Sequence, residues 1–395
     1  MSSGENKFLF ENSVPPSPSA AAPKRIVFVL SGYGKVLRGA ERFVADLAGR
    51  LADRYRIAVL GGGPATPDAP FAVPLRFPDR TNRLTAAADR TPGIGHFLRL
   101  FQLDPLNWEW LFCALAAKKW LLANPCDLLV TEGGRWGGLL GRWAHRRLGI
   151  PVVDVAHGAP SRWEDAAARC RPQAYVALTR VAAGEMARRV PGLAARVIPI
   201  GIDLDRFTPD GPREDLSALQ RPVTLSVGAL EPLKGMDTLV RATALQPAGS
   251  LVVLGRGPQR SELAALGTHL LGPKRFMMAS ARPGDMPRWY RAADAFASAS
   301  ASESFGTVYL EALACGLPVV TIGDAVRREV LSPAATLLPP GTPPGDFAAA
   351  IAAALATSAT TLPARLSFVR TRYGAPLMAS AYASLFDSLL SPSPT

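Results

Sequence analysis

The chain has 395 residues, of which 48% are hydrophobic and 19% are charged. This length and composition predict a globular protein with room for two domains and exclude a disordered or collagen-like chain. The four cysteines are scattered without C-x-x-C spacing. That pattern excludes a zinc ribbon or a thioredoxin-type pair and favours a reducing compartment.

The N-terminal segment carries no sign of a secretory signal. Residues 1–24 are rich in Ser, Pro and Ala in their second half and predict a disordered leader. No stretch of about 20 residues is free of charges and helix breakers, so no transmembrane helix is predicted. We therefore expect a cytoplasmic protein, either free or peripheral on the cytoplasmic face of the membrane.

The first half of the chain alternates short apolar runs with helical patterns. Residues 24–30 and 56–63 predict buried strands that end in glycine-containing loops. Between them, residues 39–54 carry apolar side chains at helical spacing. Similar strand-then-glycine segments continue to about residue 200. Strands that alternate with helices predict a parallel sheet covered on both faces.

The same alternation restarts after a polar, proline-containing stretch. We therefore predict a first Rossmann-like domain over 25–203 and a second over 204–374, followed by a terminal helix and a Ser/Pro tail over 375–395. Ligands of open parallel sheets bind at the carboxyl ends of the strands. The sequence thus predicts an α/β protein with two facing domains and a cleft between them.

The sharpest motif is SESFGTVYLEALACGLPVV at residues 302–320. Residues 307–315 predict a helix that Gly316 ends. The residues at its N-terminus are Ser304, Phe305, Gly306 and Thr307. Unpaired amides and the helix dipole make such a terminus a natural phosphate site.

Two glutamates flank this terminus. Glu303 precedes it, and Glu311 lies on the helix one turn beyond Thr307. Carboxylates on either side of a diphosphate can accept hydrogen bonds from the hydroxyls of a sugar and of a ribose, which together describe a nucleotide sugar. The alternative is a helix with a polar first turn and an exposed glutamate.

A second segment points to the same chemistry. VGALEPLKG at 227–235 runs from a strand into Gly228, where the backbone can approach a ligand closely. Lys234 follows and supplies a cation suited to a diphosphate. Taken alone, Lys234 fits a solvated surface lysine better.

Together these segments resemble glycosyltransferase family 4, whose members are retaining enzymes of the GT-B fold. The family's pair of glutamates with seven residues between them corresponds to Glu303 and Glu311, and its phosphate-binding lysine before a glycine corresponds to Lys234. The run YRAADAFASASASESFG at 290–306 is similar to the family's pattern. The resemblance covers most of residues 25–385.

The resemblance implies a role for each matching residue. Glu303 would orient the donor sugar, Lys234 and the helix start would hold the departing diphosphate, and Glu311 would hold the ribose. The family needs no metal or other cofactor, so none is expected. At Ala229 the chain departs from the family, which usually has an arginine there. Arg256 or Arg282 are the substitutes that the sequence offers.

The first half contains two acceptor-side segments by the same resemblance. GYGKVLRGAERF at 32–43 is similar to the family's glycine-rich acceptor loop. Its candidate residues are Gly32, Tyr33, Gly34 and Gly39. His157, in AHG after a strand, corresponds to the histidine near the transferred sugar, although a structural loop histidine fits nearly as well. Asp203 and Asp205 have D-x-D spacing, but they lie in the joining segment and are interpreted as structural.

Charge is unevenly distributed. Residues 25–203 hold 25 Lys or Arg against 15 Asp or Glu, whereas residues 204–395 hold 17 against 15. The basic first domain suits a lipid-linked or saccharide acceptor at an anionic membrane surface, or reflects arginine richness alone. No nucleic-acid motif is present. The aromatic stretch 96–122, with Trp108, Trp110 and Trp120, fits either a membrane-interface helix or a buried core helix.

These observations predict a retaining glycosyltransferase that uses a nucleotide-diphosphate sugar, in cell-envelope polysaccharide or glycolipid assembly. One rival is a catalytically impaired nucleotide-sugar-binding protein of the same fold, since Ala229 lacks a charge. A dinucleotide-dependent oxidoreductase is a weaker rival, because Val36 and Leu37 stand where the third glycine of G-x-G-x-x-G should come.

Overall fold

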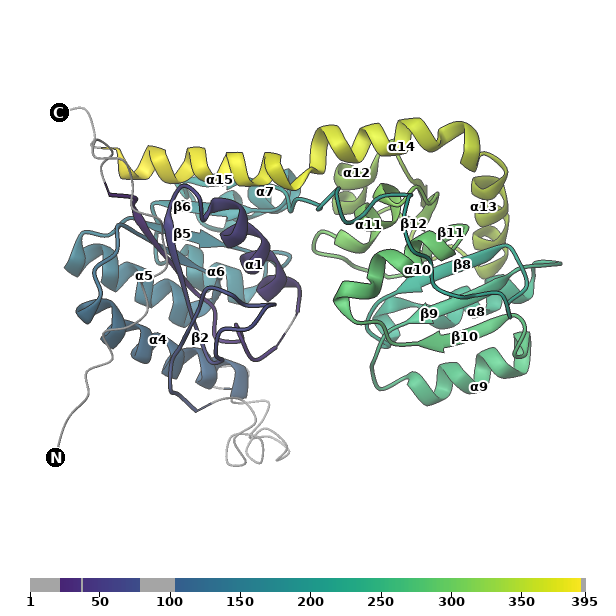
Figure 1. The fold of residues 1–395 in the computed structure, drawn as a ribbon, viewed down its shortest axis with the longest axis horizontal. Coiled ribbons are helices and arrows are strands. Elements are labelled where there is room, and N and C mark those ends of the chain that lie inside the picture. The colour runs from purple at the N-terminus through teal and green to yellow at the C-terminus, as the bar shows by residue number, and fades with distance from the viewer. Residues whose placement is uncertain (1–21, 37, 79–103, 392–395) are drawn as a thin grey trace.

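The computed structural model describes residues 22–36, 38–78 and 104–391 of the chain. They form two α/β domains that lie side by side, with the helices α14 (Ser358–Tyr373) and α15 (Ala375–Leu390) running along one side of both (Figure 1). The predicted leader and residues 96–103 of the aromatic stretch lie almost wholly outside the described residues.

Seven parallel strands form the sheet of the first domain, in the order β3-β2-β1-β4-β5-β6-β7. The strands are β1 Arg25–Val29, β2 Arg56–Gly61, β3 Ala72–Pro74, β4 Leu128–Thr131, β5 Val152–Val155, β6 Ala174–Ala177 and β7 Ala195–Val197. The helices are α1 Gly39–Leu51, α4 Pro105–Ala123, α5 Gly134–Leu148, α6 Arg162–Ala168 and α7 Arg180–Arg189. The strands β4, β5 and β6 are buried throughout, as expected where helices cover both faces.

Six parallel strands form the sheet of the second domain, in the order β10-β9-β8-β11-β12-β13. The strands are β8 Val223–Val227, β9 Ser250–Leu254, β10 Phe276–Ala279, β11 Ala295–Ser298, β12 Val319–Ile322 and β13 Thr336–Leu338. The remaining helices are α8 Met236–Ala244, α9 Arg260–Leu271, α10 Met286–Ala292, α11 Thr307–Ala314, α12 Ala325–Leu331 and α13 Pro344–Ala356. Each sheet has the strand order of a doubly wound fold, so its loops at the carboxyl ends form one binding edge.

The chain crosses between the domains twice, and the two crossings lie against each other. The Ile202 amide donates to the Tyr373 carbonyl (2.6 Å), and the Ala375 amide donates to the Ile202 carbonyl (2.9 Å). Helix α15 then returns to the first domain, where Tyr382 and Phe386 are fully buried in its core. The last helix of the chain therefore completes the first domain.

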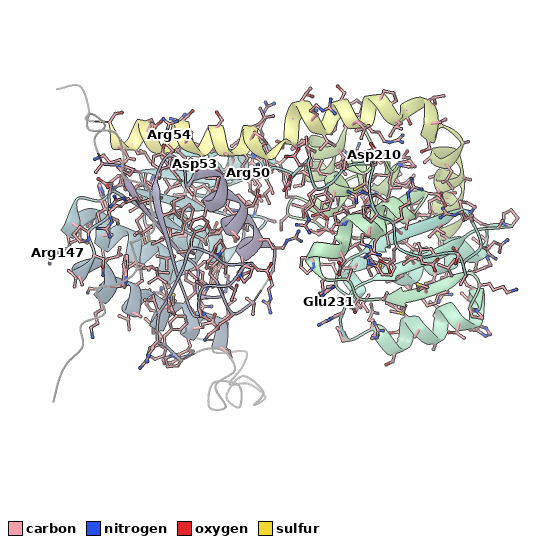
Figure 2. All side chains as sticks on the ribbon, viewed as in Figure 1. Arg50, Asp53, Arg54, Arg147, Asp210 and Glu231 are labelled. Atoms are coloured by element: carbon pink, nitrogen blue, oxygen red, sulfur yellow. The ribbon has the colours of Figure 1, made fainter. Side chains whose placement is uncertain are left out.

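The joining segment also carries the D-x-D pair. Asp203 accepts from the amide of Asp205 (3.2 Å) and forms an ion pair with Arg50 of α1 at 3.6 Å. Figure 2 shows Arg50 on the first domain near its border with the second. Through these contacts the Asp203 carboxylate ties the joining segment to α1, whereas Asp205 takes part through its backbone amide.

Helix α4 places the tryptophans of the aromatic stretch within or along the first domain. Trp110 is buried and meets Trp163 edge to face, with ring centroids 6.1 Å apart. Trp120 packs partly against the same core, and Trp108 stacks on Phe112 with centroids 5.7 Å apart. For the described residues of the stretch, this packing agrees with the core-helix alternative.

In the described part of the chain, no single helix has the length and apolar composition of a membrane span. The helices α13 and α14 have that length and composition only when they are counted as one, and they are bent by 87° at their junction.

Candidate active site

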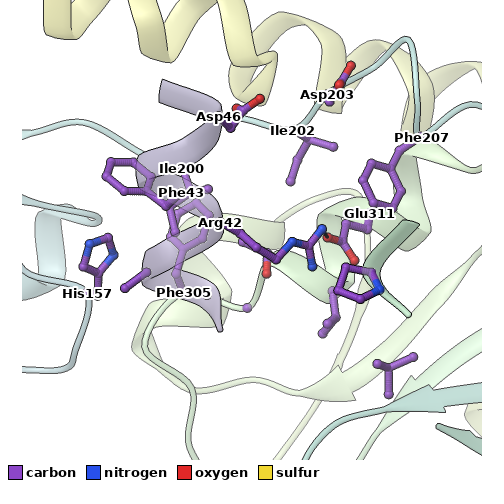
Figure 3. Close-up of a pocket in the computed structure, with 18 of the residues that line it drawn as sticks. Arg42, Phe43, Asp46, His157, Ile200, Ile202, Asp203, Phe207, Phe305 and Glu311 are labelled. Carbon is purple, nitrogen blue, oxygen red and sulfur yellow. Dashed lines mark ion pairs between the residues drawn. The ribbon is translucent and has the colours of Figure 1, made fainter. Parts of the chain in front are cut away.

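A cavity of about 570 Å³ lies between the two domains, at the carboxyl ends of both sheets. The predicted donor residues that line it are Gly228, Lys234, Glu303, Ser304, Phe305, Gly306, Thr307 and Glu311. From the first domain, Gly39 and His157 reach the same space. The fold thus brings residues from both predicted sites to one cavity, with the joining segment along its wall (Figure 3).

The N-terminus of α11 opens into this cavity. Gly306, the residue before the helix, has φ +85°, and a Cβ there would lie 2.4 Å from the Tyr309 ring, so only glycine fits. No side chain caps this helix start. Its first amides therefore face the cavity without a side-chain acceptor, which makes the terminus suitable for an anion.

Lys234 and Glu303 form an ion pair in the cavity wall. Lys234 Nζ lies 2.8 Å from Glu303 Oε1, and the two side chains are 23% and 17% exposed. The Tyr309 hydroxyl donates to the same oxygen at 3.5 Å. Sequence reasoning placed both residues at the cavity separately, and the structure adds that they hold each other in position.

Arg327 supports the loop in front of Glu303. This side chain is fully buried and donates to the carbonyls of Ser300 (2.6 Å) and Ala301 (3.3 Å). Asp324 balances the charge of Arg327, with its Oδ2 2.8 Å from Nη2 of the arginine. The sequence analysis missed Arg327, because an arginine in a short helix is typical of the surface.

Glu311 is buried at the back of the cavity. Its Oε2 accepts from the Tyr290 hydroxyl at 2.8 Å, and its Oε1 lies 3.9 Å from Nη2 of Arg42. Burial raises the pKa of Glu311, while the charge of Arg42 and the hydrogen bond from Tyr290 oppose that rise. Arg42 belongs to α1 of the first domain and points across the cavity to the second, as Figure 3 shows.

His157 is held by a carboxylate that the sequence analysis did not single out. Its Nε2 contacts Oε2 of Glu132, whose side chain is 1% exposed, and its ring meets the edge of Phe43 at 4.8 Å between centroids. Burial lowers the pKa of His157, but the charge of Glu132, its hydrogen bond to the ring and the charges of Glu41 and Asp154 together outweigh burial and raise it. Glu132 directly follows β4, so its place at a strand's carboxyl end was a usable signal.

Part of the predicted acceptor loop does not reach the cavity. Tyr33 is 1% exposed, and Gly34 lies so close to Gly63 that a Cβ would be 2.7 Å from its carbonyl carbon. A Cβ on Gly32 would meet the carboxylate of Glu41 at 2.3 Å. These three glycine-loop residues pack inside the first domain, and of the four predicted positions Gly39 alone lines the cavity.

The two arginines expected to replace the charge missing at Ala229 also lie elsewhere. Arg256 is exposed outside the cavity lining, and Arg282 is 86% exposed and paired with Asp285 at 2.9 Å. The arginines that do line the cavity are Arg42 and Arg206. The loop carrying Arg282 does reach the cavity, through Pro283 and Gly284, but the Arg282 side chain itself turns to solvent.

Comparison with known proteins agrees with this fold and site. Residues 210–367 match the family model described as glycosyl transferases group 1, and residues 37–206 match that of glycosyltransferase family 4. A protein of Geodermatophilus obscurus named D-inositol 3-phosphate glycosyltransferase is 34% identical over 86% of this chain and 84% of its own length. A similarly named Catenulispora acidiphila protein is 38% identical over 42% of this chain, which spans only 43% of that relative.

Solved structures share the two-domain architecture. The Anabaena protein HepE, crystallised with UDP, superposes with a TM-score of 0.73 at 18% identity, covering 92% of this chain and 100% of its own. Sucrose-phosphate synthase of Thermosynechococcus elongatus gives 0.72 at 20% identity, covering 94% and 100%. The resemblance seen in the sequence motifs is confirmed: the chain belongs to glycosyltransferase family 4 and has the GT-B fold.

Proposed function

We propose that this protein is a retaining glycosyltransferase that transfers a sugar from a nucleotide-diphosphate sugar to an acceptor hydroxyl. The observation that carries the proposal is the gathering of Lys234, Glu303, Glu311 and the open start of α11 around one cavity. In this assignment the diphosphate lies at the helix start, Glu303 orients the donor sugar, and Glu311 accepts hydrogen bonds from the ribose.

The leaving diphosphate needs positive potential as the glycosidic bond breaks. Lys234 and the amides of Gly306 and Thr307 supply it in this proposal, without a metal ion. Addition of EDTA is therefore expected to leave the transfer rate unchanged. His157 would contact the transferred sugar from the first domain, and closure of the domains would exclude water.

The names of similar proteins support a nucleotide-sugar donor and an anionic acceptor. HepE has been crystallised with UDP-glucose, and relatives are named for D-inositol 3-phosphate. The net charge of +10 over residues 25–203 suits an anionic acceptor, whether a soluble phosphate or a lipid-linked saccharide in cell-envelope assembly. WaaG, a neighbour with a TM-score of 0.62, is described as acting in lipopolysaccharide biosynthesis.

The test is a thermal-shift screen against UDP-, GDP- and ADP-sugars, followed by a transfer assay with the donor that raises the melting temperature. D-inositol 3-phosphate and a lipid-linked saccharide are the first acceptors to try. The coupling constant of the product's anomeric proton then reports whether configuration is retained. The proposal fails if no nucleotide sugar stabilises the protein.

A catalytically impaired binding protein is the second candidate. The observation that favours it is Ala229, which lines the cavity with a methyl group where family members carry an arginine. This candidate predicts donor binding without transfer or donor hydrolysis above background, so the same assay separates the two.

We also propose that the first domain docks on anionic membranes through an α4–α5 face, made of one exposed stripe from each helix. On α4 the stripe is Leu115, Lys118, Lys119 and Leu122; on α5 it is Arg135, Leu139, Arg142 and Arg146. The spacing of each set is that of one helix face. Lys118 lies over the Trp143 ring at 5.0 Å, which places the two helices in contact. Leucines among basic side chains are typical of an interfacial surface.

Replacing Leu115 and Leu122 together by glutamate is expected to weaken binding to phosphatidylglycerol-containing vesicles at least about tenfold, because the change removes apolar insertion and adds repulsion. The matched control is Leu245→Glu, since Leu245 of the second domain is 64% exposed and Leu122 is 62% exposed. Co-sedimentation at rising salt measures the effect. The docking proposal fails if the wild type shows no salt-sensitive sedimentation.

A further inference from the structure

The donor half of the cavity offers too few positive charges for a diphosphate. A nucleotide-sugar diphosphate brings two negative charges, and the cation next to its expected place, Lys234, is already paired with Glu303 at 2.8 Å. Ala229 contributes no charge at the end of β8. A second cation must therefore come from elsewhere if the diphosphate is to be matched.

Arg42 is placed to supply it. Its guanidinium lies 3.9 Å from Glu311, which is too long for a hydrogen bond, and among the described residues it makes no other ion pair or hydrogen bond. Thr307 precedes Glu311 by four residues on α11, which is about 6 Å of helix rise, so the open amides lie about one helical turn from the residue that Arg42 meets. An arginine side chain covers that distance by changing rotamers.

Arg206, the other arginine in the lining, is held differently. Its guanidinium donates to the carbonyl of Pro283 and lies 5.1 Å from the centre of the Phe207 ring. Both partners keep it against the joining segment and the neighbouring loop. Arg42, by contrast, extends freely from α1 toward the cavity in Figure 3.

We infer that Arg42 binds the donor diphosphate from the opposite domain, in place of the side chain missing at Ala229. On donor binding, the guanidinium would leave Glu311 and donate to phosphate oxygens, which frees Glu311 Oε1 for a ribose hydroxyl. Because Arg42 belongs to the first domain, donor binding in the second domain would then depend on how far the two domains have closed. This inference rests on the proposed function.

The experiment compares binding of UDP with binding of uridine to the full chain by calorimetry; GDP with guanosine or ADP with adenosine replaces them if the wild type prefers another base. Arg42→Ala and Arg42→Gln are expected to weaken UDP binding about 10- to 100-fold and to change uridine binding less than threefold, since only UDP carries the phosphates. Arg256→Ala is the control, because it removes the same charge outside the cavity.

A second variant tests the replacement directly. Ala229→Arg added to Arg42→Ala restores a cation at the end of β8 and is expected to recover most of the lost UDP affinity. The inference is overturned if both Arg42 variants bind UDP as tightly as the wild type or more tightly, or if UDP and uridine weaken equally, which would mean that Arg42 acts through Glu311. If the wild type binds no nucleotide diphosphate at all, the proposed function itself fails.

Discussion

The Glu303→Gln variant is expected to fold like the wild type and to lose about 10²- to 10³-fold in transfer rate. Glutamine has nearly the same shape, and its oxygen can still accept from Lys234 and Tyr309, which now hold the carboxylate at 2.8 and 3.5 Å. It cannot carry the negative charge that orients the donor sugar and balances Lys234. The melting temperature reports folding, and kcat with the donor identified in the screen reports the chemistry.

Glu231→Gln provides the matched control for this variant. Glu231 is an exposed glutamate three residues before Lys234 and does not line the cavity (Figure 2). Its amide variant is expected to keep kcat within about twofold of the wild type, because a solvated charge outside the cavity is screened. Equal rates for the wild type and Glu303→Gln would remove Glu303 from the mechanism.

The fold was predictable because each signal was local. A strand buried on both faces reads as a continuous apolar run, and the glycines that end it mark the turns. Lys234 and Glu303 could be assigned to one site from sequence, since both follow strands whose carboxyl ends share one edge of the second sheet. The same rule was available for Glu132 and His157, which follow the neighbouring strands β4 and β5.

Arg42 and Arg327 could not be found in this way. Arg42 lies on a helix of the first domain, and its partner Glu311 lies on a helix of the second, so their contact depends on how the domains are placed. Arg327 is fully buried only because the loop at Ser300 folds back over it. Both residues have the local sequence of surface arginines, and their roles arise from tertiary structure.

In the acceptor-side loop the sequence instead predicted binding residues that the structure places in packing contacts. Gly32 and Gly34 stand where a glycine-rich binding loop is expected, but the Glu41 carboxylate occupies the space beside Gly32, and the backbone of Gly63 that beside Gly34. A glycine required for packing within a domain and a glycine required for ligand approach look the same in sequence. The distinction becomes visible only when the neighbouring atoms are known.

The Glu132→Gln variant is expected to reverse how stability around His157 depends on pH. In the wild type the charge of Glu132 raises the pKa of His157 above its ordinary value of 6.5. A histidine with a raised folded pKa contributes stability that is fully present below 6.5 and is lost as the pH rises through the raised value. In the variant the charge of Glu132 is gone, and burial, the largest single influence, lowers the pKa of His157 against only the charges of Glu41 and Asp154, so we expect stability to fall toward acid pH instead.

The two proteins are therefore expected to differ most in acid-to-neutral buffer and least at alkaline pH above the raised pKa of His157, where His157 is neutral in both. At its maximum the difference in unfolding free energy is expected to be about 3 kcal/mol, the usual cost of removing one partner from a buried ion pair. Burial also raises the pKa of Glu132, so on acidification Glu132 takes up a proton, and the charged pair is lost, at a higher pH than for an exposed glutamate. Urea unfolding across about pH 5–9 measures the curve.

The double variant Glu132→Gln, His157→Gln is the control. It has neither titratable group but keeps two side chains that can hydrogen-bond, so its unfolding free energy should show none of the pH dependence that comes from this pair. A constant difference between the wild type and Glu132→Gln across the whole range would show that the contact is not an ion pair. If the difference in unfolding free energy instead has a maximum and declines toward alkaline pH, as expected, His157 is a cation in the folded protein near neutral pH. It would then offer the incoming donor or acceptor a positive charge on the wall opposite Lys234.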